Sequence, residues 1–101
     1  MITNLSQLKK AMNNGTPFEI VKHYIKPEYT GQIRKPNKVQ TNGIYSIVVN
    51  EPDNPVTKAN DGKGSWIEYG KARDWTFEDG ICTQFLHGRV IWEIRVMENV
   101  V

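Results

Sequence analysis

The sequence has a single cysteine, Cys82, and therefore no internal disulfide. It has no apolar run near the roughly 20 residues that a membrane-spanning helix requires. The first residues, Met1-Ile2-Thr3-Asn4, lack the basic and then apolar order of a signal peptide. These absences predict a cytoplasmic protein that does not enter a membrane. Cys82 itself lies in an alternating apolar stretch, which indicates a small core or near-surface residue and not a nucleophile.

Motifs for catalysis, phosphate binding and metal binding are also lacking. His23 has no second histidine, cysteine or acid at a metal-ligand spacing, so we expect a surface or partly packed histidine. Gly62-Lys63-Gly64-Ser65 has neither the full spacing of a phosphate loop nor a helix after it. Glu68 and Glu93 could face each other across strands, but solvated strand faces carry such carboxylates far more often than a hydrolase site does. We therefore expect no enzyme, no cofactor and no bound metal.

Size and composition predict one domain over residues 1–101, with ten aromatic residues to fill a small core. The net charge of +2 hides an asymmetry between the two halves of the chain. Residues 1–50 hold seven Lys or Arg and two acids, a net charge of +5, whereas residues 51–101 hold six and nine, a net charge of −3. Such an asymmetry is typical of an interaction surface.

The N-terminal residues predict a helix followed by a strand. Residues 4–13 carry an apolar stripe at helical spacing, with Asn4 or Thr3 as the N-cap and Gly15 just after the end. The stripe consists of Leu5, Leu8 and Met12. Residues 17–25 then predict the first strand, with a loop at 27–31. In that strand Phe18, Ile20 and Tyr24 alternate with Glu19, Val21 and His23.

A β-hairpin is predicted over residues 33–49, because Asn42-Gly43 is the strongest short-range signal for a two-residue turn. Such a turn sets Thr41 opposite Ile44 and Lys38 opposite Ile47. Pro36 cannot donate to a ladder, so the first arm is expected at a sheet edge or at a bulge. The second arm is apolar on both faces, and we infer that the N-terminal helix covers one of them.

The aromatic-rich stretch at 64–77, GSWIEYGKARDWTF, is expected to organise the chain. Its first part predicts a short strand over 65–69, and residues 71–74 suit a turn or a single 3₁₀ turn. Trp75 resumes an extended pattern that closes at Asp79-Gly80. Trp66 and Trp75 either fill a small core or form an aromatic platform beside the basic turn.

The remaining segments predict a loop and two strands. Residues 50–64 are polar and turn-rich, so we expect a mobile surface loop, whereas 81–86 and 89–97 have strand patterns joined by His87-Gly88. On the last strand the expected inward residues are Val90, Trp92, Ile94 and Val96, and the expected outward residues are Arg89, Glu93 and Arg95.

The predicted fold class is α+β, mostly β. An N-terminal helix precedes five or six antiparallel strands within residues 17–97, which form a small SH3-like barrel or a strongly bent sheet. An OB-type barrel is the alternative, and it fits less well because its helix normally lies inside the strand order.

Three segments carry a family resemblance: residues 39–43 (VQTNG), 64–72 (GSWIEYGKA) and 92–94 (WEI). In this order they resemble small uncharacterised proteins of Gram-positive bacteria and of their phages and mobile elements. The resemblance covers most of the chain. It implies a cytoplasmic, phage-related accessory protein, and it transfers no activity and no functional residue.

Two functions fit these patterns, and both are non-enzymatic. The first is a nucleic-acid-binding accessory module with basic residues on phosphates and an aromatic residue that stacks on a base. Its candidate residues are Arg34, Lys35, Lys38, Trp66, Lys71 and Arg73. The second is a protein-interaction or inhibitor module that uses the arm near Pro36 or the loop at 50–64. A pI of 8.7 is below the usual value for a dedicated nucleic-acid binder, so the two stay open. An enzyme is the third and least favoured class.

Overall fold

The computed structural model describes residues 1–36, 45–49 and 65–98 of the chain. The predicted loop at 50–64, the turn at Asn42-Gly43 with its facing pairs, and the tail at 99–101 lie outside the described residues. The elements in chain order are α1 (Leu5–Asn13), β1 (Phe18–His23), the 3₁₀ turn η1 (Pro27–Tyr29), β2 (Ile33–Arg34), β3 (Tyr45–Val49), β4 (Ser65–Glu68), the 3₁₀ turn η2 (Ala72–Asp74), β5 (Trp75–Glu78), β6 (Ile81–Leu86) and β7 (Arg89–Val96).

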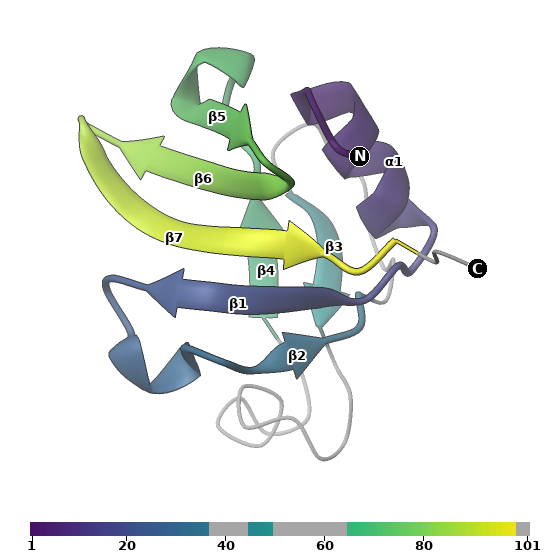
Figure 1. The fold of residues 1–101 in the computed structure, drawn as a ribbon, viewed down its shortest axis with the longest axis horizontal. Helices are drawn as coiled ribbons and strands as arrows, with labels where there is room; N and C mark the ends of the chain where they lie inside the picture. The colour runs from purple at the N-terminus through teal and green to yellow at the C-terminus, as the bar shows by residue number, and fades with distance from the viewer. Residues whose placement is uncertain (37–44, 50–64, 99–101) are drawn as a thin grey trace.

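Five of these strands form one antiparallel sheet in the order β2-β1-β7-β6-β5, and β3 pairs with β4 in a separate two-stranded sheet. Figure 1 shows β3 and β4 behind the larger sheet and running across the direction of its strands, with α1 on the side toward which β7 points. The predicted helix and the mostly β fold are confirmed. Among the described strands the sheet bends strongly and does not close into a barrel.

The helix forms as its pattern predicts. The side chain of Asn4 accepts a hydrogen bond from the Gln7 N–H at 2.9 Å, which satisfies one of the free donors at the helix start. The apolar stripe of Leu5, Leu8 and Met12 is buried against the core. The helix also contacts β3, as inferred from the apolar character of that strand.

Two tight turns join β5, β6 and β7 into two consecutive hairpins of the larger sheet. Asp79-Gly80 links β5 to β6, and His87-Gly88 links β6 to β7. All four residues have positive φ, between 51° and 78°, which is the backbone of a two-residue turn that matches the twist of the flanking strands. Both turns lie where the sequence predicts them.

Each neighbour of β7 meets it at a β-bulge close to Trp92. Along β1 the register shifts between Ile20 and Lys22, so Val21 is the extra residue. Along β7 the register shifts opposite Gln84 and Phe85, so Ile91 is the extra residue. A bulge bends a strand and increases its twist. Two bulges at one level explain the strong curve of β7 (Figure 1).

The bulge at Val21 corrects the strict alternation predicted for residues 17–25. That alternation puts His23 on the face opposite Phe18. In the structure both rings contact Trp92, with centroid distances of 5.7 Å from His23 and 5.8 Å from Phe18. Tyr24 instead lies on the other face, where its hydroxyl donates to Glu93. One inserted residue therefore exchanges the faces of His23 and Tyr24.

The stretch that the sequence singles out links the two sheets. Gly70 takes a φ of 64°, and a Cβ there would lie 2.9 Å from the Asp74 carboxylate, so the position requires glycine. The Asp74 carboxylate accepts from the Lys71 N–H at 2.9 Å and so fixes the turn η2. Trp75 is buried, and its indole N–H donates to the Tyr69 carbonyl at 2.7 Å. The core interpretation is thereby confirmed for Trp75, whereas the Trp66 side chain lies outside the described part of the chain.

A single core lies between the sheets and α1, and its buried members include Phe18, Ile20, Tyr69, Cys82, Trp92, Ile94 and Val96. The inward positions predicted on β7 are confirmed for Trp92, Ile94 and Val96, whereas Val90 is only half-buried. Gln84, a buried amide, accepts from the Trp92 indole N–H at 2.8 Å and donates to the Glu68 carbonyl at 2.7 Å. These bonds tie β7, β6 and β4 together.

The hairpin predicted over 33–49 stays a prediction, because its turn and the residues that would face β3 lie outside the described residues. The described parts have other partners. β2 pairs with β1, through Phe18–Arg34 and Glu19–Ile33, and β3 pairs with β4. The turn η1 brings β2 back beside β1, where the Gly31 N–H donates to the Ile20 carbonyl at 2.7 Å. Pro36, expected on an exposed arm, is buried.

Trp92→Ala is expected to lower the free energy of unfolding by about 3–5 kcal/mol, because it empties a large core site and leaves the Gln84 amide without its indole partner. Chemical denaturation of the parent and of the variant measures this difference. Thr76→Ala, at an exposed position of β5, is the control and should change stability by less than about 0.5 kcal/mol. A Trp92 variant as stable as the control would contradict this packing.

Candidate functional site

The structure separates the basic residues that the sequence grouped as a nucleic-acid site. Lys35 is exposed after β2, at one edge of the larger sheet, and Lys71 and Arg73 are exposed at η2, next to β5 at the other edge. Four strand spacings of about 4.8 Å separate these edges by roughly 19 Å. Arg34 is buried with 4% of its surface exposed, whereas Lys38 and the Trp66 side chain lie outside the described residues. The described members thus do not form one patch.

A groove lies instead where the end of β1 meets the β6–β7 turn. It has a volume of about 680 Å³ and is lined by Tyr24, Ile25, Leu86, His87, Arg89, Val90 and Ile91. Its apolar lining is open to solvent: the exposed fractions are 44% for Tyr24, 62% for Ile25 and 53% for Leu86. Apolar side chains this exposed and this close together are typical of an interaction surface.

The position of Tyr24 in this groove follows from the bulge at Val21. Its backbone N–H donates to the Ile91 carbonyl at 2.9 Å, and its hydroxyl donates to a Glu93 carboxylate oxygen at 2.6 Å. The hydrogen bond to Glu93 raises the pKa of the Tyr24 hydroxyl above its usual value. The Lys22 ammonium lies 4.7 Å from the centroid of the Tyr24 ring. The ring is therefore held in one orientation before any partner arrives.

The charge around the groove is mainly positive. Arg89 is the charged residue of its described lining, and Lys22 covers the Tyr24 ring at its border. Lys26 follows Ile25 directly in the chain. The negative charge of Glu93 lies beside the Tyr24 hydroxyl and is outnumbered by these three cations. This surface combines apolar contacts with an excess of cations.

Sequence reasoning missed this groove because its parts are remote in the chain. Ile25 and Leu86 are 61 positions apart and meet only through the pairing of β1, β7 and β6. A local signal did exist. Each of these apolar residues lies at a strand end, Ile25 next to Lys26-Pro27 and Leu86 next to His87-Gly88, where a strand pattern does not require burial.

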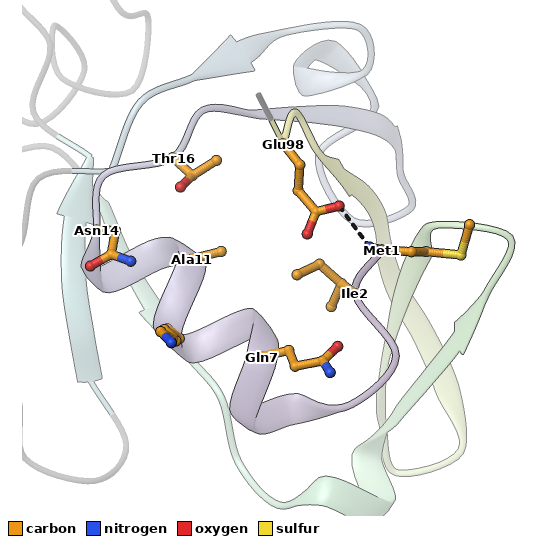
Figure 2. Close-up of a pocket in the computed structure, with 8 residues that line it drawn as sticks. Met1, Ile2, Gln7, Ala11, Asn14, Thr16 and Glu98 are labelled. Atoms are coloured by element: carbon orange, nitrogen blue, oxygen red, sulfur yellow. Dashed lines mark ion pairs between the residues drawn. The ribbon is translucent and has the colours of Figure 1, made fainter. Parts of the chain in front are cut away.

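A second cavity of about 390 Å³ lies between α1 and the end of β7 (Figure 2). The Met1 amino group makes an ion pair with Glu98 at its edge, at 3.1 Å. Gln7, Asn14 and Thr16 add polar atoms to the lining, and Ile2 adds a buried apolar side chain. Its mixed lining has no exposed apolar cluster comparable to that of the groove.

His23, Tyr29 and Arg34 form a stacked cluster beside the end of β1. The Arg34 guanidinium lies 4.5 Å from the Tyr29 ring centroid, and the His23 ring meets the same ring edge-on at 5.4 Å. His23 Nδ1 accepts from the Lys26 N–H at 2.9 Å. Burial first, and then the positive charge of Arg34, lower the pKa of His23 below its usual 6.5. His23 is thus the partly packed histidine that its isolation in the sequence predicts.

The part of the chain that the structure describes contains no group of three or more His, Cys, Asp or Glu residues that could hold a metal ion. Within the same residues, no helix has the length and apolar character to cross a membrane. Comparisons of the chain with protein-family models, with curated proteins and with solved structures found no match. The resemblance to small proteins of Gram-positive bacteria and their phages therefore stays a prediction.

The stability of the protein is expected to fall as the pH falls through the pKa of folded His23. Because that pKa is depressed, the stabilising neutral form is present above the unfolded value of 6.5, and protonation removes the acceptor of the Lys26 N–H. Melting temperatures between pH 8 and pH 5 measure the effect. His23→Gln should flatten this slope, whereas His87→Gln in the exposed turn should leave it unchanged. Equal slopes in all three proteins would contradict the assignment.

Cys82 is expected to be unreactive in the folded protein. Its thiol is fully buried, and burial raises its pKa to about 12. Reaction with Ellman's reagent at pH 7.5 should therefore be more than about a hundredfold slower than that of free cysteine, since the thiolate is the reactive form. Denaturant should restore the rate. Rapid labelling of the native protein would contradict the core position of Cys82.

Proposed function

We propose that the protein is a non-enzymatic module that binds another protein, and that the groove beside Tyr24, Ile25 and Leu86 receives an acidic segment with an apolar anchor. One observation carries this proposal. Of the six large hydrophobic residues that are exposed in the described part of the chain, three line this one groove. Such clustering is the usual mark of a surface that is covered in a complex.

The charge pattern selects the kind of partner. Arg89 lines the groove and Lys22 borders it, so a segment that brings carboxylates to this surface gains attraction and a basic segment is repelled. The surroundings of Tyr24 favour an extended peptide over a base or a sugar as the ligand of the groove. Tyr24 has its hydroxyl engaged with Glu93 and one side of its ring covered by Lys22, so it offers little of the open face that base stacking needs.

The size of the groove indicates weak binding. Complete burial of an aliphatic side chain contributes about 1.5–3 kcal/mol, and Ile25 and Leu86 are already partly covered. Together with charge attraction, and after the entropic cost of association, this gives a dissociation constant on the order of 100 μM for a short peptide. A larger partner would gain affinity from contacts beyond the groove.

Two capped peptides test the proposal by titration into the ¹⁵N-labelled protein. One has Leu-Phe flanked by glutamates, and the other has the same core flanked by lysines. The acidic peptide is expected to bind at least about fivefold more tightly, with amide shifts concentrated at residues 24–25 and 86–91. A fifteen-nucleotide single strand serves as the third probe.

Matched variants separate the groove from the rest of the surface. Ile25→Ser should weaken binding of the acidic peptide about tenfold, whereas Ile33→Ser, at a residue equally exposed but outside the lining, should have no effect. Arg89→Glu should reverse the preference between the peptides, and Arg73→Glu should not. Shifts scattered over the surface would contradict the proposal. If the protein binds the oligonucleotide and neither peptide, the nucleic-acid-binding function would replace this proposal.

A further inference from the structure

Arg34 is a buried cation that has no anionic partner among the described residues. It lies on β2 directly opposite the fully buried Phe18, and only 4% of its surface is exposed. Burial lowers the pKa of its guanidinium, which means that the surroundings disfavour the charge. Buried charged groups are normally paired with an opposite charge, because transfer of a charge out of water is costly.

The contacts of Arg34 hold its side chain in place but do not neutralise its positive charge. Its Nε and Nη2 donate to the side-chain oxygen of Gln32, at 3.2 Å and 2.7 Å, and its Cζ lies 4.5 Å from the Tyr29 ring centroid. Gln32 is neutral, and no carboxylate among the described residues forms an ion pair with Arg34. Arg95 shows the contrast, since it pairs with Glu19 at 2.6 Å. A guanidinium has five N–H donors, so two bonds to Gln32 leave three for another acceptor.

The neighbours of Arg34 add further donors. Because His23 Nδ1 accepts the Lys26 N–H, the proton of the neutral ring is on Nε2, which is then a donor. The charges that act on His23 are those of Arg34, Lys26 and Glu28, two cations and one acid. Glu28 lies on η1, where its backbone carbonyl accepts the Gln32 amide at 3.4 Å. The cluster is therefore rigid, rich in donors and positive.

We propose that the cluster of His23, Tyr29 and Arg34 is a binding site for an oxyanion, either a carboxylate or a phosphate group, held by the free donors of the Arg34 guanidinium. The planar fork of an arginine suits both groups. Tyr29 fixes the plane of the fork, and Gln32 fixes its rotation. This site is independent of the groove, and it gives the buried arginine the counter-charge that the described side chains do not supply.

The ring of His23 reports on occupancy. The positive charge of Arg34 disfavours the imidazolium, so an anion bound to Arg34 cancels that effect and raises the His23 pKa. The His23 ring signals are followed by ¹H–¹³C NMR from pH 8 to pH 5 in chloride, acetate and inorganic phosphate at equal ionic strength. The same titrations of the Arg34→Gln variant correct for general salt effects.

An increase in the His23 pKa of about 0.5 or more, a threefold change in proton affinity, is expected in acetate or phosphate relative to chloride. A response to phosphate alone identifies a phosphate group as the ligand, and a response to acetate alone identifies a carboxylate. Arg34→Gln should abolish the response, Arg34→Lys should retain part of it, and Lys35→Gln, at the exposed neighbour, should retain all of it. The same His23 titration in all three salts would overturn the proposal. A response that Lys35→Gln removes as fully as Arg34→Gln would also overturn it, because that result indicates surface screening.

Discussion

The side-chain amide of Gln84 joins the two sheets, and their relative position depends on this contact. It donates to the Glu68 carbonyl of β4 and accepts the indole N–H of Trp92 on β7. A second indole, that of Trp75, donates to the Tyr69 carbonyl just beyond β4. Apolar burial alone would allow the sheets to slide past each other. A buried amide or indole that loses its partner costs about 1–3 kcal/mol, so these bonds select one arrangement.

Most elements of the fold could be predicted because their signals are local. The cap at Asn4 and the turn at Asp79-Gly80 each depend on a few consecutive residues. The pairing of β2 with β1 could not be predicted in the same way, since it depends on the path of the backbone through η1 and not on a turn motif. The bulge at Val21 has no compositional signal either. An inserted residue in a ladder depends on what lies opposite, and a single sequence does not contain that information.

The candidate sites likewise combine features that a local sequence signal predicts with features that depend on strand pairing. A basic cluster can be read from the sequence, but its placement requires the strand order, which sets Lys35 and Lys71 at opposite edges of the sheet. The burial of Arg34 depends on its pairing with Phe18 and could not be seen from the alternation around it. The groove unites Ile25 with Leu86 through two intervening strand pairings. Exposed apolar residues at strand ends are the feature of the sequence that, in retrospect, points to it.

The strand order also governs when the sheet can form during synthesis. β7 lies between β1 and β6, yet it follows every other described strand in the chain. The ion pair of Glu19 with Arg95 spans 76 positions, so β1 gains its second neighbour, β7, only after nearly the whole described chain. Until then the pairings of β1 with β2, β3 with β4 and β5 with β6 can form without β7. Joining β1 to β7 therefore requires a long loop closure, which favours slow folding after synthesis and leaves one edge of β1 open for that time.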